Sequence, residues 1–191
     1  MNMYAATLEQ ALETLGHLLL DRNYEYEVVA IGGGSLLLLG QILRMTKDLD
    51  LVALVDSEEF ISAYPLPKNL LQAVNEVGLA LDLGKDWLNA GPAALLEMGL
   101  PDGFKTRMQT RRYGGLTVHL AARFDQICFK LYASIDQGPE SKHFADLKLL
   151  NPTEDELTKA ANWCITHDVS EEFSVILQQV IMSLRGKNAN S

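Results

Sequence analysis

Two aspartates, Asp48 and Asp50, lie in the segment IGGGSLLLLGQILRMTKDLDL at residues 31–51, after a glycine-rich turn and a short apolar stretch. Residues two apart in an extended strand point to the same face of a sheet. We therefore expect the two carboxylates to project together while Leu49 and Leu51 enter the core. Paired carboxylates suit Mg²⁺ or Mn²⁺, because such a cation takes its remaining ligands from water and substrate phosphates. The pair predicts a divalent-cation site.

Three consecutive glycines, Gly32, Gly33 and Gly34, come just before Ser35, where a short apolar helix over residues 35–43 is expected to begin. Glycine lets the backbone approach an anion closely, and the first N–H groups of a helix point outward without partners. We expect the turn to bind phosphates, with Ser35 either capping the helix or donating its hydroxyl to a phosphate. Turn and carboxylates together predict attack on a nucleoside triphosphate with pyrophosphate leaving.

Neither element is specific alone, because a glycine run is usually only a turn and Asp-x-Asp occurs in many surface loops. No Gly-Lys-Ser/Thr follows the glycines, and the G-x-G-x-x-G spacing of a dinucleotide turn is absent. The order strand, glycines, helix, Arg-x-Thr-x-Asp-x-Asp, strand is far more specific. It adds Arg44 and Thr46 to the predicted nucleotide-binding residues.

The hydrophobic periodicity predicts an α+β fold, a small mixed sheet flanked by helices with a helical C-terminal part. Strands concentrate in the first two thirds of the chain and helices in the last third. This pattern divides the chain into an α/β core at 1–122 and a helical region at 123–191 that packs on it. The expected elements are a helix opened by a Thr7–Gln10 capping box, strands 26–31 and 49–55, a helix 66–81, loop with short helical turns at 86–103, a hairpin 105–121 turning at Gly114–Gly115, and helices opened by Thr153 with Glu156 and by Ser170.

The charge composition limits which kinds of binding partner the protein can have. The net charge of -9 argues against a general nucleic-acid binder, which normally needs a basic excess. Four basic residues near the hairpin are a local exception, and they are either a solvated edge strand or a docking strip for an anionic substrate. They are Lys105, Arg107, Arg111 and Arg112.

The cellular compartment is read from the cysteines and the N-terminus. Cys128 and Cys164 are far apart and fall in apolar helical patterns, so we interpret them as reduced core thiols. The N-terminus is not a signal peptide, and no run reaches the roughly 18 apolar residues that span a membrane. We expect a cytoplasmic protein with no membrane partner. Trp87 and Trp163 are either core residues or base-stacking residues.

The quoted motifs resemble the nucleotidyltransferase superfamily that includes DNA polymerase beta and the aminoglycoside nucleotidyltransferases. More narrowly, they are similar to a bacterial branch related to abortive-infection AbiE-type toxins, as is the DWLN segment at residues 86–89. The resemblance implies a nucleotidyltransferase-like fold and Mg²⁺-dependent transfer of a nucleoside monophosphate to an unknown hydroxyl on RNA, protein or a small molecule. It also implies a possible cognate antitoxin. The matching residues are Gly32, Gly33, Ser35, Leu36, Arg44, Thr46, Asp48 and Asp50.

Two later positions leave alternatives open. The resemblance groups Lys130 with Lys142 and Asp146 and implies that Lys130 contacts triphosphate oxygens. Its position beside an apolar stripe is equally typical of a surface lysine whose stem lies along the protein. Active members commonly carry a third carboxylate on a neighbouring strand, whereas here the outward residues of that strand are Thr117 and His119.

Two non-enzymatic hypotheses follow. A chain without the third carboxylate is also consistent with a catalytically inactive module that binds a nucleotide or a protein. Alternatively, the apolar C-terminal helix docks a partner or a second copy of the chain, giving a homodimer.

Overall fold

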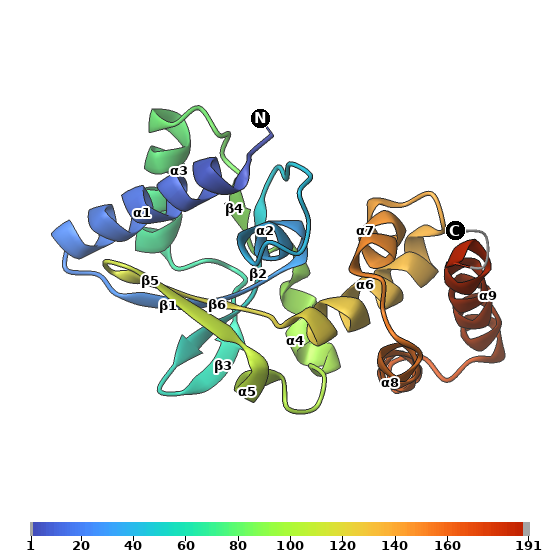
Figure 1. Cartoon of the computed structure of the whole chain (residues 1–191). Helices are drawn as coiled ribbons and strands as arrows, with labels where there is room; N and C mark the ends of the chain where they lie inside the picture. Colours follow the sequence, from blue (N-terminus) through green and yellow to red (C-terminus); the bar gives the residue numbers. More distant parts are fainter. Residues whose placement is uncertain (1, 189–191) are drawn as a thin grey trace. The chain divides into compact units, whose positions relative to one another are not determined.

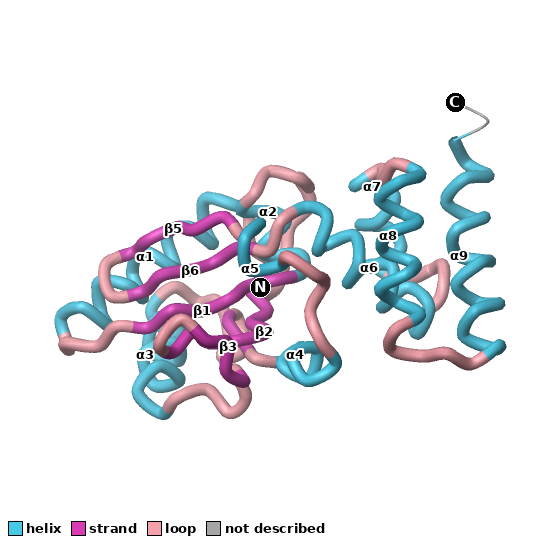
Figure 2. Tube along the Cα trace, turned by 90° about the horizontal axis from the view of Figure 1, so that it is seen from below, coloured by secondary structure: helices cyan, strands magenta, loops and turns pink. Residues whose placement is uncertain are grey.

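Apolar residues fill most of the segment Tyr26–Ile31, which forms the central strand of a mixed sheet (Figure 1). This strand pairs antiparallel with β2 on one side and parallel with β6 on the other. The strands follow the order β3-β2-β1-β6-β5, with β4 pairing with β2, and Figure 2 shows the main strands side by side. Within residues 2–188, which the computed structural model describes, the strands are β1 (Tyr26–Ile31), β2 (Leu49–Asp56), β3 (Glu59–Ser62), β4 (Leu88–Asn89), β5 (Gln109–Tyr113) and β6 (Leu116–Leu120).

Helices α1 (Ala5–Asp21) and α3 (Lys68–Ala80) cover one face of this sheet (Figure 1). Their apolar residues recur at helical spacing, so each helix turns one stripe toward the strands. The opposite face, termed the polar face, carries Glu27, Thr117 and His119 alongside the buried Val29. The buried core between helices and sheet includes Leu8, Leu12, Leu15, Leu19, Val28, Leu51, Val74, Leu116 and Val118.

The chain divides into two compact units, the first ending at Ala122 and the second beginning at Arg123. Short helical segments in the first unit are α2 (Gly32–Leu38), η1 (Gly91–Ala93), α4 (Ala94–Met98) and α5 (Phe104–Arg107). The second unit contains α6 (Arg123–Gln137), α7 (Lys142–Leu150), α8 (Glu154–Ile165) and α9 (Glu171–Asn188). In the described part of the chain, no helix is long and apolar enough to cross a membrane.

The predicted α+β fold is confirmed, with strands before Ala122 and only helices after it. The capping box at Thr153 and Glu156 is present, and Ser170 accepts a hydrogen bond from the Phe173 N–H at the start of α9. Cys128 and Cys164 are buried and form no disulfide, as expected. These predictions held because each rests on contacts within a few residues of chain.

Three local predictions are wrong. Helix α1 begins at Ala5 after Tyr4 and has no side-chain cap, so Thr7 is inside the helix rather than at its start. Helix α2 spans Gly32–Leu38, so the glycines themselves form its first turn. Strands β3 and β4 lie in segments for which no strand was predicted, because both are short and depend on pairing with β2.

The four basic residues near the hairpin do not form a strip. Lys105 and Arg107 lie on α5, before the edge strand begins. Arg111 reaches Glu9 on α1 and the Leu38 carbonyl, whereas Arg112 is exposed on the strand. Alternation along β5 sends the two arginines to opposite faces, which excludes a continuous docking surface.

A β-bulge interrupts the pairing of β1 with β2. Val29 lies opposite Ala53 and Ala30 opposite Leu51, so Val52 is an extra residue on β2. A bulge shifts the side-chain alternation by one position along the bulged strand. Beyond it, Asp50 lies opposite Ile31 and therefore on the polar face of the sheet.

In the second unit, His167 lies in an aromatic cluster. Its ring centroid is 4.5 Å from that of Trp163 and 5.8 Å from that of Tyr132, and its Nε2 is buried without a hydrogen-bond partner. Burial lowers the pKa of His167 from its ordinary value of 6.5. The folded state therefore disfavours the protonated ring.

This depressed pKa predicts acid-dependent stability. The stability linked to His167 is fully present above the unfolded-state pKa near 6.5 and is lost as pH falls below it, because the unfolded state then binds the proton more readily. The variant His167→Phe keeps an aromatic ring but cannot titrate. We expect the unfolding free energy of the wild type to fall more steeply than that of the variant between pH 8 and pH 5.5. Urea unfolding followed by tryptophan fluorescence measures both, and parallel pH profiles would contradict the prediction.

Candidate nucleotide site

The glycine turn and the carboxylate segment pack directly against each other. A Cβ added to Gly32 would lie 2.8 Å from Asp50 Oδ2, and one added to Gly34 would lie 2.6 Å from the Asp48 carbonyl oxygen. A Cβ on Gly33 would lie 3.2 Å from an Arg44 guanidinium nitrogen. Each glycine thus faces a different residue of the Arg-x-Thr-x-Asp-x-Asp segment, and the two motifs form one site.

The conformation of the turn also requires glycine at its first position. Gly32 has φ of 77°, a left-handed backbone that costs an L-residue roughly 1–2 kcal/mol. Gly33 and Gly34 are buried, and Gly32 is half-buried. The close approach of α2 to the segment at Asp48 explains the buried glycines, whereas their binding to phosphate stays a prediction.

Ser35 does not cap the helix, because it is the fourth residue of α2 and Ile31 is the N-cap. The side chain is fully buried, and its Oγ has no hydrogen-bond partner. An unpaired buried hydroxyl is costly, typically about 1–3 kcal/mol. The hydroxyl therefore remains a candidate donor behind the turn.

The segment before Asp48 is held by the N-terminus. Met3 and Thr46 exchange two backbone hydrogen bonds, with N–O distances of 2.6 and 3.0 Å. Thr46 is buried and donates its hydroxyl to the Asp48 carbonyl oxygen at 3.1 Å. Arg44 is half-buried and donates to the Met45 carbonyl oxygen. Thr46 thus fixes the backbone that carries the first carboxylate.

The two carboxylates are accessible, and the apolar residues between them are not. Asp48 and Asp50 are half-buried, whereas Leu49 and Leu51 are fully buried in the core. This alternation is the one expected from the sequence.

Asn89 is a site residue that sequence reasoning missed. It lies opposite Asp50 in the β4–β2 pairing and donates its amide nitrogen to Asp50 Oδ1 at 3.2 Å. The Gly91 N–H donates to Asn89 Oδ1 at 2.8 Å, which fixes the amide so that its nitrogen faces the carboxylate. The DWLN resemblance marked this segment, but only the strand pairing assigns the contact.

No carboxylate lies beside Asp50 on β6. Its outward residues are Thr117 and His119, as predicted, and His119 lies opposite Val29. The β6 position level with Ile31 and Asp50 is Ala121, whose N–H donates to the Ala30 carbonyl. Strand spacings place the Cα of His119 about 12 Å from that of Asp50, too far for both to bind one ion. Asp82 follows α3 and Asp125 is buried in α6, so neither of these acids is on this strand.

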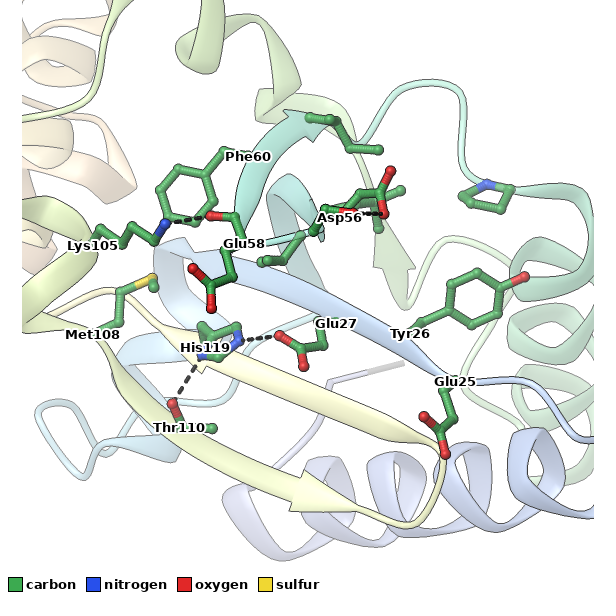
Figure 3. Close-up of a pocket in the computed structure, with 15 residues that line it drawn as sticks. Glu25, Tyr26, Glu27, Asp56, Glu58, Phe60, Lys105, Met108, Thr110 and His119 are labelled. Atoms are coloured by element: carbon green, nitrogen blue, oxygen red, sulfur yellow. Dashed lines mark hydrogen bonds and ion pairs between the residues drawn. The ribbon is translucent and has the colours of Figure 1, made fainter.

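His119 belongs instead to a cleft of about 920 Å³ on the polar face of the sheet (Figure 3). Its Nε2 lies 3.1 Å from Glu27 Oε2, and its Nδ1 lies 2.9 Å from the Thr110 hydroxyl. The carboxylate partner indicates that Nε2 carries the proton in the neutral ring. In the sequence, Glu27 could have been recognised as a functional candidate because it is the only acid within the apolar strand β1. The charged residues lining the cleft are Glu25, Glu27, Asp56, Glu58 and Lys105.

Lys130 lies in the second unit and is not a surface lysine. Its side chain is 4% exposed, and its Nζ lies 2.7 Å from Oδ2 of Asp146, which is fully buried. Lys142 is exposed at the start of α7. The pairing of Lys130 with Asp146 joins two residues that the resemblance grouped together, while contact of Lys130 with a triphosphate stays a prediction.

The donor set at Asp48 and Asp50 fits a hard cation that also has substrate ligands. Among residues 2–188, no group of three or more His, Cys, Asp or Glu residues could hold a metal ion by itself. Mg²⁺ normally uses one or two carboxylates and completes its shell with water and phosphate oxygens. The two accessible carboxylates match that requirement.

A comparison with known families identifies the fold. The model of the family described as nucleotidyltransferase of unknown function, DUF6036, matches residues 6–141. The chain belongs to this nucleotidyltransferase family. The matched range contains the glycine turn and both aspartates of the site. No curated protein and no solved structure matched the chain.

Membership of this nucleotidyltransferase family confirms the predicted superfamily and a nucleotidyltransferase-like mixed sheet. The narrower relation to AbiE-type toxins stays a prediction. Strand β1, helix α2 and strand β2 are the elements that build the site in this member of the family.

The packing of the glycine turn predicts a sharp difference between two adjacent substitutions. Gly34→Ala places a methyl group 2.6 Å from a backbone oxygen, and overpacking of this kind costs about 1–3 kcal/mol. Gly33→Ala meets only side-chain atoms at 3.2 and 3.3 Å, which can move, so its loss should be below about 1 kcal/mol. Neither residue has a positive φ, so the comparison contains no left-handed strain. Chemical denaturation measures both losses, and equal losses would refute the close packing.

Proposed function

We propose that this nucleotidyltransferase transfers a nucleoside monophosphate from a nucleoside triphosphate to a hydroxyl acceptor. The observation that carries the proposal is the packing of Gly32 against the Asp50 carboxylate and of Gly34 against the Asp48 backbone. Family membership supports the reaction class. The half-buried Asp48, Asp50 and Gly32 further support the binding of a metal-bound triphosphate.

The reaction requires one bond to form and one to break. The acceptor oxygen bonds to the α-phosphorus, the bond from that phosphorus to the β-phosphate bridging oxygen breaks, and pyrophosphate leaves with the electron pair. The hydroxyl proton passes to water. Gly32 and the Arg44 guanidinium beside Gly33 offer donors that orient the phosphate oxygens, so catalysis is mainly positioning and charge stabilisation.

Asp48 and Asp50 would hold Mg²⁺ or Mn²⁺, which would neutralise charge on the phosphates when bound. Asn89 donates to one oxygen of Asp50 and so restrains the orientation of that carboxylate. Hydrogen-bonded partners of this kind commonly change metal affinity 10- to 100-fold. Thr46 supports Asp48 through the backbone in the same way.

The polar-face cleft is the natural place for the acceptor, because Asp50 projects from the same face. Four carboxylates and one lysine line it, so an RNA phosphate backbone is disfavoured there. A neutral or cationic small molecule, or a protein side chain, fits this lining better. His119 would contact such an acceptor without contacting the metal.

Substitution of either aspartate should abolish transfer. We expect Asp48→Asn and Asp50→Asn each to reduce pyrophosphate release by at least about 100-fold, because a metal ligand is lost while the shape is kept. Asp21→Asn, at the exposed end of α1 and outside both the polar-face cleft and the hollow beside Asn89, is the matched control and should retain activity. The assay supplies each of four labelled nucleoside triphosphates with Mg²⁺ or Mn²⁺ and cell extract as acceptor. Absence of label transfer by the wild type would refute the enzyme.

The second candidate is a catalytically inactive module that binds a nucleotide or a protein. The observation that favours it is the lack of a third carboxylate on β6, whose outward residues are Thr117 and His119 and which is followed by Ala121 level with Ile31 and Asp50. Calorimetry separates the two candidates. Metal-dependent binding of a nucleoside triphosphate that is lost in the double variant Asp48→Ala and Asp50→Ala fits both, but only the enzyme releases pyrophosphate.

We further propose that the protein is a cytoplasmic toxin with a cognate antitoxin. The motif resemblance supports the toxin role, and the two buried cysteines without a disulfide support the cytoplasmic location. We expect expression of the wild type in bacteria to arrest growth and Asp48→Asn to relieve the arrest. Asp21→Asn, outside both hollows, should arrest growth like the wild type. Colony counts after induction measure the effect, and arrest by the Asp48→Asn variant would exclude a toxic transferase activity.

A further inference from the structure

A second hollow, of about 640 Å³, lies next to Asp50 in the first unit. It is lined by the end of β3, by β4 and by the start of α4. The lining residues that matter here are Tyr64, Asp86, Asn89, Ala93, Ala94 and Glu97.

Asn89 connects this hollow to the candidate metal site. Its side chain lines the hollow and also donates to Asp50 Oδ1 at 3.2 Å. A nucleoside whose α-phosphate lies at the carboxylates has its base only one ribose away. The polar-face cleft shares its sheet face with Asp50, but neither Asp48 nor Asp50 nor Asn89 lines it, so it is assigned to the acceptor and not to the base.

The lining suits a nucleobase. The aromatic side chain of Tyr64 is 74% exposed. An aromatic ring at a surface offers a large apolar face on which a planar ligand can stack. Ala93 and Ala94 are small apolar residues that leave room for a planar ring. Asp86 and Glu97 are acceptors only, so they can bind an exocyclic amino group and repel phosphates. The phosphates are thereby directed to the glycine turn.

We propose that this hollow binds the base of the nucleoside triphosphate, with Tyr64 stacking on it and the carboxylates selecting a base with an exocyclic amino group. The inference rests on the proposed function, because it assigns a subsite to the same reaction. Adenine, guanine and cytosine carry such an amino group, and uracil does not. The expected order of affinity therefore places uridine nucleotides last.

The test compares Tyr64→Ala with Tyr64→Phe in the full chain. The ligands are α,β-methylene analogues of ATP and UTP with Mn²⁺, which cannot be cleaved at the reacting bond, and inorganic tripolyphosphate. Loss of stacking should weaken binding of the ATP analogue roughly 5- to 150-fold in Tyr64→Ala, since stacking is worth about 1–3 kcal/mol per base. Tyr64→Phe keeps the ring face and should bind like the wild type. Calorimetry measures each dissociation constant.

Two controls distinguish failure of the base subsite from failure of the proposed function. Leu79→Ala removes another highly exposed side chain, on α3 and outside the hollow, and should leave the affinity for the ATP analogue unchanged. Tripolyphosphate should bind the wild type and Tyr64→Ala equally. Unchanged affinity of Tyr64→Ala for the ATP analogue would overturn the base subsite and leave the proposed function standing. No binding of any nucleotide by the wild type would overturn both.

Discussion

The candidate site depends on close contact between three consecutive glycines and the strand-entry segment that carries the aspartates. Any side chain at Gly34 would meet the Asp48 backbone, and one at Gly32 would meet the Asp50 carboxylate. The absence of side chains therefore lets α2 lie directly on the start of β2. Because packed interiors leave no spare volume, this contact fixes the height of the helix over both carboxylates.

Around that contact, each carboxylate is held from a different direction. Asp48 is held through its backbone by Thr46, which the N-terminal Met3 holds in turn. Asp50 is held through its side chain by Asn89 on β4. Segments far apart in the chain thus converge on two residues, which is how a rigid site is built from short elements.

The bulge at Val52 connects this site to the rest of the sheet. It shifts the alternation of β2, so that Leu51 and Leu54 both face the helices while Asp50 shares the polar face with His119 and Glu27. A strand without the extra residue would place Leu54 and Asp50 on the same face. One inserted residue therefore lets β2 bury its leucines against the helices while Asp50 projects from the polar face of the sheet.

The sequence by itself determined the α+β class, the elements 26–31 and 49–55, and the alternation of Asp48 and Asp50 with two core leucines, because these depend on contacts between residues close in the chain. The glycine and aspartate motifs also predicted a joint role in binding phosphate and metal, because they are close in the chain. Only the tertiary structure decided that the glycines begin α2, that Asn89 contacts Asp50, and that Lys130 pairs with Asp146. Strand register and burial set these features, and both arise from contacts between residues distant in sequence.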